Sequence, residues 1–268
     1  MTRIPRAAAL VIAVFLAGCA AKETPYVERP VQEIYNAAVD RLEAGNYADA
    51  ATEFDEVERQ HPYSIWATKA QIQAAYAHYQ ANKYDEAIIS LDRFIQLHPG
   101  NRDIAYAYYL KALCYYEQIS DVARDQNNTQ QALSALREVI RRFPNSRYSR
   151  DATLKIDLTR DHLAGKEMAV GRYYLRRGEP LAAINRFRRV VDDYQTTTHV
   201  PEALHRIAEA YATVGLYAEA KKAAAVLGHN YPGSEWYGDS YDLVTTNGEA
   251  RRQQADKGLF TRAWDWVF

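Results

Sequence analysis

Near the end of the chain, apolar residues recur three or four positions apart, which is the spacing of one buried face on a helix. The residues of this face are Leu204, Ile207, Ala208 and Tyr211. Gly215 predicts the end of that helix, because glycine tolerates the left-handed backbone that a helix stop often needs. A second helix is predicted from the apolar positions Ala220, Ala224 and Leu227. Pro232 ends it, since proline lacks the amide donor and clashes with the preceding turn. The segment therefore predicts a helical hairpin.

The same pattern returns along the chain. In four copies an alanine lies twelve positions before a proline, namely Ala50, Ala87, Ala132 and Ala220 before His61-Pro62, His98-Pro99, Phe143-Pro144 and Tyr231-Pro232. A fifth copy is degenerate, with Ala183 leading to Gln195. Three copies also carry a turn and a tyrosine, Gly45-Asn46-Tyr47, Asn82-Lys83-Tyr84 and Gly215-Leu216-Tyr217. Such self-similarity predicts stacked units that bury their apolar faces against neighbours. The order of small, aromatic and proline positions fits the tetratricopeptide repeat of roughly 34 residues. We therefore predict an all-α superhelical array of about five tetratricopeptide helical hairpins.

Two of the repeats are longer than the others. The spacings between successive alanines are 37, 45, 51 and 37 residues. In the third repeat the excess is the polar stretch 120–128, which predicts a loop. In the fourth repeat no such stretch exists, and residues 149–177 are mostly helix formers. This composition predicts an unusually long first helix, with a bend at Gly165 as one possibility.

The N-terminus indicates where the array works. Arg3 and Arg6 precede an apolar run, residues 7–16, which is too short to span a bilayer and has the flanks of a secretory signal. The tetrad Leu16-Ala17-Gly18-Cys19 resembles a bacterial lipobox. The resemblance implies a signal peptide over residues 1–18, acylation of Cys19 by fatty acids such as palmitate, and a lipidated tether over residues 19–30. Ala20 resembles the outer-membrane class of these signals, which implies a lipid anchor on the periplasmic face of the outer membrane.

Composition and charge narrow the classes of function. The chain is 48% hydrophobic and 25% charged, as globular proteins are, and its net charge of −1 gives no general attraction for nucleic acid. An acylated Cys19 cannot pair with Cys114, which lies in a crowded helical segment and is interpreted as a buried structural thiol. The seven histidines do not pair at metal-ligand spacing. We therefore expect no catalytic residue, no metal and no cofactor.

Several blocks of sequence carry a specific resemblance. They are residues 47–51, 54–64, 92–99, 106–111, 142–148 and 173–178. Together with the lipobox, the insertion in repeat three and the long helix of repeat four, these blocks resemble the BamD family, the tetratricopeptide lipoproteins of the outer-membrane β-barrel assembly machine. The resemblance covers about residues 31–232. The chain departs from the family pattern at Pro180 and at Gln195, which leaves the geometry of the fourth hairpin open.

The resemblance implies two binding regions. Repeats one and two, residues 31–102, would receive the targeting segment of unfolded outer-membrane proteins in an apolar groove formed by Tyr35, Val39, Leu42, Ile72, Tyr76 and Tyr79. The alternative is that these side chains simply pack between repeats. Repeats three to five, residues 103–247, would dock on the periplasmic domains of the barrel-forming core subunit, beside other assembly lipoproteins. The docking residues implied are Arg186, Arg172 and Arg176.

The aromatic tail, residues 248–268, has two interpretations. As a helix it would place Phe260, Trp264 and Val267 on one face for docking on a partner or the membrane surface. As an extended segment it would resemble a barrel targeting segment and occupy the chain's own groove. A different function also stays open, in which the chain is a periplasmic tetratricopeptide scaffold lipoprotein for cell-wall or envelope-tethering machinery.

Overall fold

The computed structural model describes residues 27–246, and these residues form helices and turns without a strand. The helices are α2 (Val31–Glu43), α3 (Tyr47–Gln60), α4 (Ile65–Gln80), α5 (Tyr84–Leu97), α6 (Ile104–Glu117), α7 (Asn127–Arg142), α8 (Arg147–Arg176), α9 (Pro180–Asp193), α10 (Val200–Thr213) and α11 (Tyr217–Asn230). A further helix begins at residue 235 and is described up to residue 246. The predicted signal peptide, Cys19 and the tail over residues 248–268 lie outside the described residues. Five successive pairs, from α2/α3 to α10/α11, confirm the predicted array of five helical hairpins.

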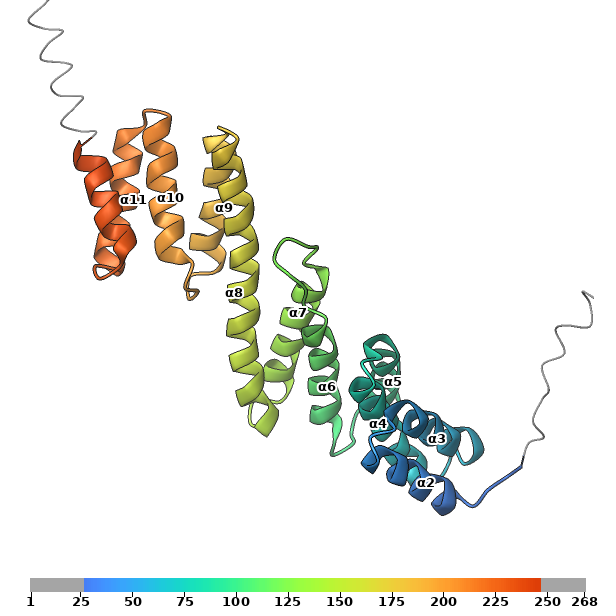
Figure 1. Ribbon diagram of the computed structural model, residues 1–268. Coiled ribbons are helices and arrows are strands. Elements are labelled where there is room, and N and C mark those ends of the chain that lie inside the picture. Colours follow the sequence, from blue (N-terminus) through green and yellow to red (C-terminus); the bar gives the residue numbers. More distant parts are fainter. Residues whose placement is uncertain (1–26, 247–268) are drawn as a thin grey trace, which may run out of the picture.

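The hairpins stack into an elongated, curved array (Figure 1). Each helix packs mainly against the helices that precede and follow it in the sequence. The two ends of the described chain therefore lie at opposite ends of the molecule. Within the described part, no helix combines the length and the apolar character that a membrane crossing requires.

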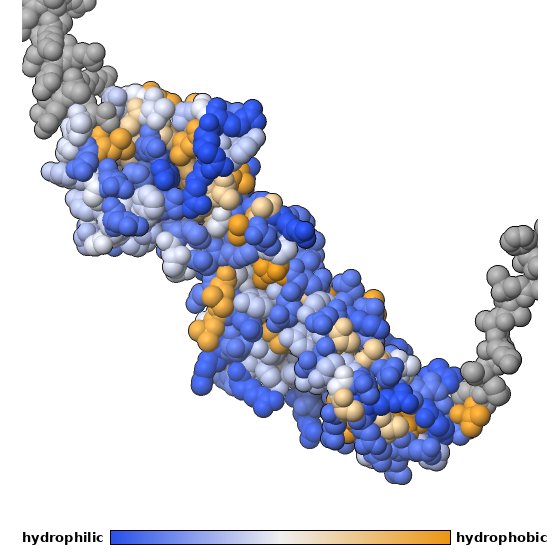
Figure 2. Space-filling view, in the orientation of Figure 1, coloured by the Kyte–Doolittle hydropathy of each residue, from blue (hydrophilic) through white to orange (hydrophobic). Residues whose placement is uncertain are grey.

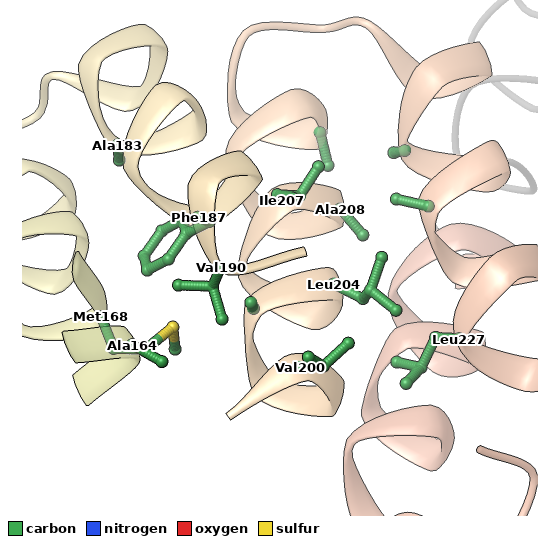
Figure 3. Packing of buried hydrophobic residues seen from close by; sticks show 14 residues of the cluster. Ala164, Met168, Ala183, Phe187, Val190, Val200, Leu204, Ile207, Ala208 and Leu227 are labelled. Atoms are coloured by element: carbon green, nitrogen blue, oxygen red, sulfur yellow. The ribbon is translucent and has the colours of Figure 1, made fainter. Parts of the chain in front are cut away.

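The repeated alanines lie in the core of the array. Ala50, Ala87, Ala132, Ala183 and Ala220 are all fully buried. Four positions later each second helix carries another buried apolar residue, namely Phe54, Leu91, Leu136, Phe187 and Ala224. The small alanine lets the first helix of the hairpin approach, and in the first four repeats a larger residue fills the space one turn further along. Figure 3 shows this packing in the C-terminal repeats, where Phe187 and Val190 meet Ala164 and Met168.

Left-handed residues close the hairpins. Gly45, Gly178 and Gly215 have φ angles of 78°, 74° and 79°, and Asn82 takes the same role with a φ of 58°. Glycine adopts this conformation without steric cost, and asparagine tolerates it better than most residues. Pro180 stands at the first position of α9, where a missing amide donor costs nothing. The departure at Pro180 is therefore compatible with an ordinary hairpin turn.

The two long repeats meet in space. Helix α8 runs unbroken for 30 residues, which confirms the predicted long helix. The predicted loop is also present, but it spans residues 118–126, because Asn127 and Asn128 already belong to α7. Lys166 of α8 donates hydrogen bonds of 3.0 and 3.1 Å to the carbonyl oxygens of Ala123 and Arg124. The insertion of repeat three is thus held by the extension of repeat four.

The helix that begins at residue 235 covers the last hairpin. Tyr237 lies so close to Gly228 of α11 that a Cβ at that glycine would come within 2.8 Å of the ring carbon Cζ. Trp236 lies against His205 of α10, with ring centroids 5.3 Å apart. His205 Nδ1 is 2.8 Å from the buried hydroxyl of Ser240. These contacts close the open apolar face that the last unit of a repeat array would otherwise expose.

Candidate functional site

The first half of the predicted groove lies against the core of repeat one. The ring of Tyr35 packs at 5.5 Å from that of Phe54 and at 4.8 Å from that of Trp66. Val39 and Leu42 are half-buried against the same cluster. Each of the three predicted side chains therefore contributes to packing and keeps part of its surface exposed.

The second half of the groove belongs to another cluster. Ile72, Tyr76 and Tyr79 are half-buried against the core of repeat two. The Tyr76 hydroxyl accepts a hydrogen bond of 2.6 Å from Gln80 Nε2. Burial, with the nearby Glu117 carboxylate, raises the pKa of Tyr79 to about 12, so this hydroxyl stays protonated and donates to Glu117 at 3.4 Å. The six residues thus follow one another along the first helices of two repeats, in two packing clusters.

A cavity of about 450 Å³ adjoins these repeats on another side. It is lined by Asp55, Glu58, Arg59, Pro62, Gln71, Ile89, Ser90 and Arg93. Most of these residues lie on α3 and α5, the second helices of their hairpins. Arg93 pairs with Glu58 across it at 2.6 Å. Six of its eight lining residues are polar or charged, and none of the eight is a predicted groove residue.

Arg172 and Arg176 line one cavity between α8 and α10. Its volume is about 290 Å³, and its other lining residues are Leu175, Arg206 and Glu209. Arg172 donates two hydrogen bonds, of 2.8 and 2.6 Å, to the carboxylate of Glu202. Although burial opposes its ionisation, the hydrogen bond and charge of Arg172 lower the pKa of Glu202. The pair is therefore ionised at neutral pH and fixes the wall of the cavity, while Arg176 is exposed.

Arg186 lies apart from this cavity, on α9. Its guanidinium is 3.2 Å from Glu167 of α8, and Arg189 lies at the same distance from the other oxygen of that carboxylate. Glu167 is well covered, whereas the Arg186 side chain keeps 35% of its surface exposed. Two guanidinium groups thus share one carboxylate, which leaves a surplus of positive charge at this point.

Cys114 is fully buried in α6. Burial raises the pKa of its thiol to about 12, so it is neutral at physiological pH and packs as a small apolar residue. The interpretation of Cys114 as a structural thiol agrees with this. Among residues 27–246, no group of three or more histidine, cysteine, aspartate or glutamate side chains could hold a metal ion.

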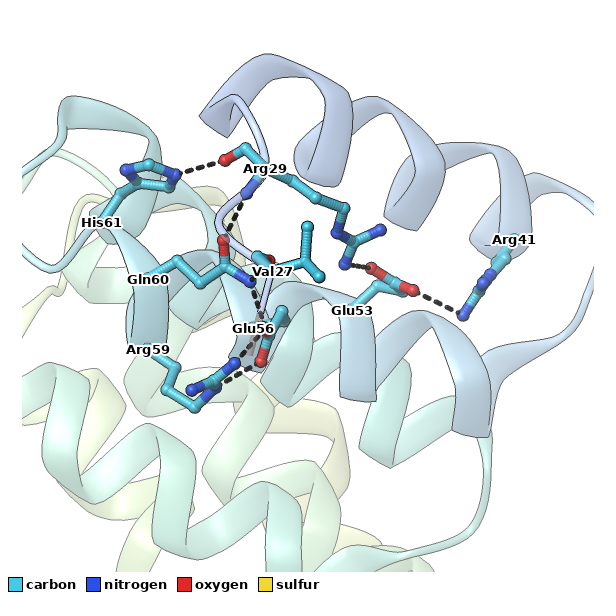
Figure 4. A network of polar contacts seen from close by, with 8 residues as sticks. All are labelled: Val27, Arg29, Arg41, Glu53, Glu56, Arg59, Gln60 and His61. Carbon is cyan, nitrogen blue, oxygen red and sulfur yellow. Dashed lines mark hydrogen bonds and ion pairs between the residues drawn. The ribbon is translucent and has the colours of Figure 1, made fainter. Parts of the chain in front are cut away.

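The sequence did not reveal a polar network at the N-terminal end (Figure 4). Residues 27–30, which we call the N-terminal strap, run along the end of α3. The Arg29 amide donates to Gln60 Oε1 at 2.8 Å, and Gln60 Nε2 donates to the Val27 carbonyl at 3.3 Å. His61 Nε2 lies 2.7 Å from the Arg29 carbonyl oxygen. The last part of the predicted tether is therefore fixed on repeat one.

The Arg29 side chain extends the same network. Its guanidinium pairs with Glu53 at 2.7 Å, and Arg41 of α2 pairs with the other oxygen of Glu53 at 3.0 Å. His61 belongs to the repeat motif, but its bond to the strap has no local sequence signal, because it joins residues 32 positions apart.

Comparisons with known proteins agree on one family. Residues 27–227 match the family described as outer membrane lipoprotein, YfiO. The chain is 55% identical over 245 residues to the outer membrane protein assembly factor BamD of Caulobacter vibrioides, across 90% of this chain and 80% of that protein. It is 49% identical over 238 residues to BamD of Rickettsia prowazekii, across 88% of this chain and 95% of that protein.

Among solved structures, a thermophilic TPR protein of Thermus thermophilus is 20% identical, with a TM-score of 0.37. That similarity covers 82% of this chain and 98% of that one, and the repeat assignment rests instead on the helix packing described above. Three findings agree: the sequence identity over nine-tenths of the chain, the match to the family profile, and the five stacked hairpins. The chain belongs to the BamD family of outer membrane protein assembly factors.

Proposed function

We propose that this chain is the lipid-anchored subunit of a complex that inserts β-barrel proteins into the outer membrane. Its relatives are named outer membrane protein assembly factors, and the matching family is described as an outer membrane lipoprotein. The protein is a non-enzymatic scaffold, since arrays of helical hairpins bind other chains along extended surfaces. Acyl chains on Cys19 would hold it on the periplasmic face of the membrane.

The N-terminal repeats would receive the targeting segment of unfolded outer-membrane proteins. Partly exposed aromatic rings, Tyr35, Tyr76 and Tyr79, support this role. Such rings offer an apolar face to the aromatic side chains of an extended peptide and a hydroxyl to its backbone.

The C-terminal repeats would dock on the barrel-forming core subunit, alongside other lipoproteins of the complex. The observation that carries this proposal is the shared carboxylate of Glu167. Arg189 can keep Glu167 neutralised while Arg186 turns to a carboxylate of the partner in a bidentate pair. Docking through Arg186 therefore leaves no buried carboxylate unpaired. The exposed Arg176 would add a second contact, and Arg172 would hold its cavity in shape.

A pulldown of the tagged lipoprotein from envelopes in mild detergent tests the docking proposal. Arg186→Glu should abolish recovery of the core subunit, because a reversed charge at a buried interface costs about 2–5 kcal/mol. Arg188→Glu is the matched control, because this exposed arginine on the same helix donates to the Tyr211 hydroxyl and not to Glu167, so the variant should retain the partner. Normal recovery with Arg186→Glu refutes docking at this residue. Recovery of peptidoglycan synthases in place of the core subunit refutes the assembly function itself.

Binding of a synthetic targeting peptide to the purified protein tests the groove. Tyr35→Ala and Tyr76→Ala should each weaken binding about tenfold, which corresponds to about 1.4 kcal/mol. The control is Tyr241→Ala, an exposed tyrosine at the opposite end of the array. Unchanged affinity in folded Tyr35→Ala and Tyr76→Ala proteins means that these residues serve only in packing between repeats.

A further inference from the structure

The turn between α3 and α4 carries two large apolar side chains in water. Tyr63 is fully exposed, and Ile65 keeps 76% of its surface exposed. Ile65 follows the helix cap Ser64, whose hydroxyl accepts a hydrogen bond from the Trp66 amide at 3.1 Å, so the turn is well fixed. Neither side chain is needed for the turn, because its hydrogen bonds come from the backbone and from Ser64.

The other repeats provide an internal comparison. Tyr63 and Ile65 stand one and three positions after the repeat proline. The residues at these two positions in repeats two to five are Gly100 and Arg102, Asn145 and Arg147, Thr196 and Thr198, and Gly233 and Glu235. All eight are small or polar. In repeats three and five the next helix also begins three positions after the proline, so a turn of the same length accepts polar residues there. Among the five repeats, only the first carries an apolar pair at these positions.

The N-terminal strap ends beside this turn. His61, two residues before Tyr63, binds the Arg29 carbonyl oxygen, and Gln60 binds the Val27 carbonyl oxygen. Val27 itself is 67% exposed. We call the three exposed apolar side chains at this end of the array, those of Val27, Tyr63 and Ile65, the end surface. Figure 2 shows hydrophobic surface at this end of the molecule, beside the point where the N-terminal residues join.

The distance from this end surface to the lipid anchor is short. Seven residues, 20–26, separate Cys19 from Val27. Even a fully extended chain of that length spans only about 25 Å. If Cys19 is acylated, the end surface is held close to the plane of the bilayer.

We infer that the end surface of Val27, Tyr63 and Ile65 rests on the outer membrane and forms a second membrane contact next to the lipid anchor. The inference rests on the proposed acylation of Cys19. Tyrosine favours the boundary between headgroups and acyl chains, since its ring is apolar and its hydroxyl stays wet. Membrane attachment by two adjacent signals also restricts rotation, which attachment by lipid alone does not. The contact orients repeat one, and with it the proposed peptide groove, relative to the membrane.

The test uses the mature full-length lipoprotein in vesicles of phosphatidylethanolamine and phosphatidylglycerol that contain brominated lipid. An environment-sensitive fluorophore is attached at Tyr63→Cys or, as the matched control, at Asn145→Cys, the same position in repeat three. Cys114 is buried and does not compete for the label. We expect quenching at position 63 to be at least about twofold stronger than at position 145. Ile65→Arg, which installs the residue of repeats two and three, should reduce the quenching at position 63 towards the control.

The outcomes separate the two proposals. Mass spectrometry of the N-terminal peptide first establishes the acyl groups. A chain without them refutes the lipid anchor and overturns the membrane contact with it. An acylated chain with equal quenching at positions 63 and 145 overturns the membrane contact alone. A fluorophore at position 63 that responds to the core subunit, and not to the vesicle, also overturns the membrane contact. That result assigns the end surface to a partner protein.

Discussion

At the scale of single residues, Gly171 shows how little space separates the helices of repeat four. The ring of Phe187 lies directly on the α8 backbone at this point, and a Cβ on Gly171 would stand 2.7 Å from the ring carbon Cζ. We expect Gly171→Ala to lower the free energy of unfolding by about 1–3 kcal/mol, because a ring in a tight core cannot move without strain. Urea unfolding monitored by circular dichroism measures the loss.

Gly100→Ala is the control for this substitution. Nothing lies within 4 Å of a Cβ at Gly100, so its stability should change by less than about 0.5 kcal/mol. Equal effects of the two substitutions would contradict the role assigned to the contact between Gly171 and Phe187.

A second residue links stability to pH. Burial, with the nearby Arg206 guanidinium, lowers the pKa of His205. In the unfolded chain a histidine has a pKa of about 6.5. Just below that pH the unfolded state binds a proton, whereas the folded state binds it only at a lower pH. The contribution of neutral His205 to the free energy of unfolding is therefore complete above about pH 6.5, and it is lost as the pH falls towards the lower pKa of His205 in the folded state. We expect the midpoint of unfolding to decrease when the pH is lowered from about 7.5 to about 5. The decrease should be smaller in His205→Gln.

His229→Gln is the control, because it removes an exposed histidine at the end of α11 and leaves His205 in place. If His205→Gln and the unchanged protein lose stability equally over this range, another group carries the pH dependence.

At the scale of elements, the long helix α8 serves two repeats at once. Its first half packs with α7 and its second half with α9, and the loop over residues 118–126 lies against the region between them. Lys166→Met removes both hydrogen bonds to this loop and should cost about 1 kcal/mol. We expect amide exchange in residues 118–126 to become about fivefold faster, since about 1 kcal/mol changes an opening equilibrium by that factor.

Lys155→Met is the matched control on the same helix, because Lys155 contacts the Tyr116 ring and not the loop. Exchange in the loop should not change in this variant. A loop that keeps its exchange rate in Lys166→Met is held by other contacts, such as the packing of Val122 near Gly165 of α8.

At the scale of the whole molecule, the core is a chain of separate clusters. The apolar cluster around Phe54 lies in repeat one, and the one around Phe187 lies in repeats four and five. Phe54→Ala should cost about 3–5 kcal/mol. Since helices contact mainly their neighbours, we expect the loss of amide protection to be confined to α2–α4. Phe187→Ala should show the reverse pattern, with α8–α10 exposed and α2–α4 protected. Loss of protection along the whole array in either variant would contradict this local behaviour.

The helices, the five hairpins and three of their turns could be predicted from the order of amino acids alone. These features follow from local spacing, because both signals lie within a single hairpin. One is an alanine twelve positions before a proline, and the other is a glycine at a left-handed turn. The long helix α8 was also predictable, because its residues favour helix and lack a stop signal.

Three contacts became apparent only in the folded chain. The loop of repeat three meets α8, Arg186 and Arg189 share the carboxylate of Glu167, and the N-terminal strap binds the end of α3. The strap contact and the contact of the loop with Lys166 join residues 31 to 43 positions apart. A polar side chain pairs with whichever group the fold brings within hydrogen-bond distance, so a local pattern of apolar and polar residues does not specify its partner. The same limit applies to the end surface of Val27, Tyr63 and Ile65, because the strap that carries Val27 is fixed by hydrogen bonds with Gln60 and His61 that join residues 33 and 32 positions apart.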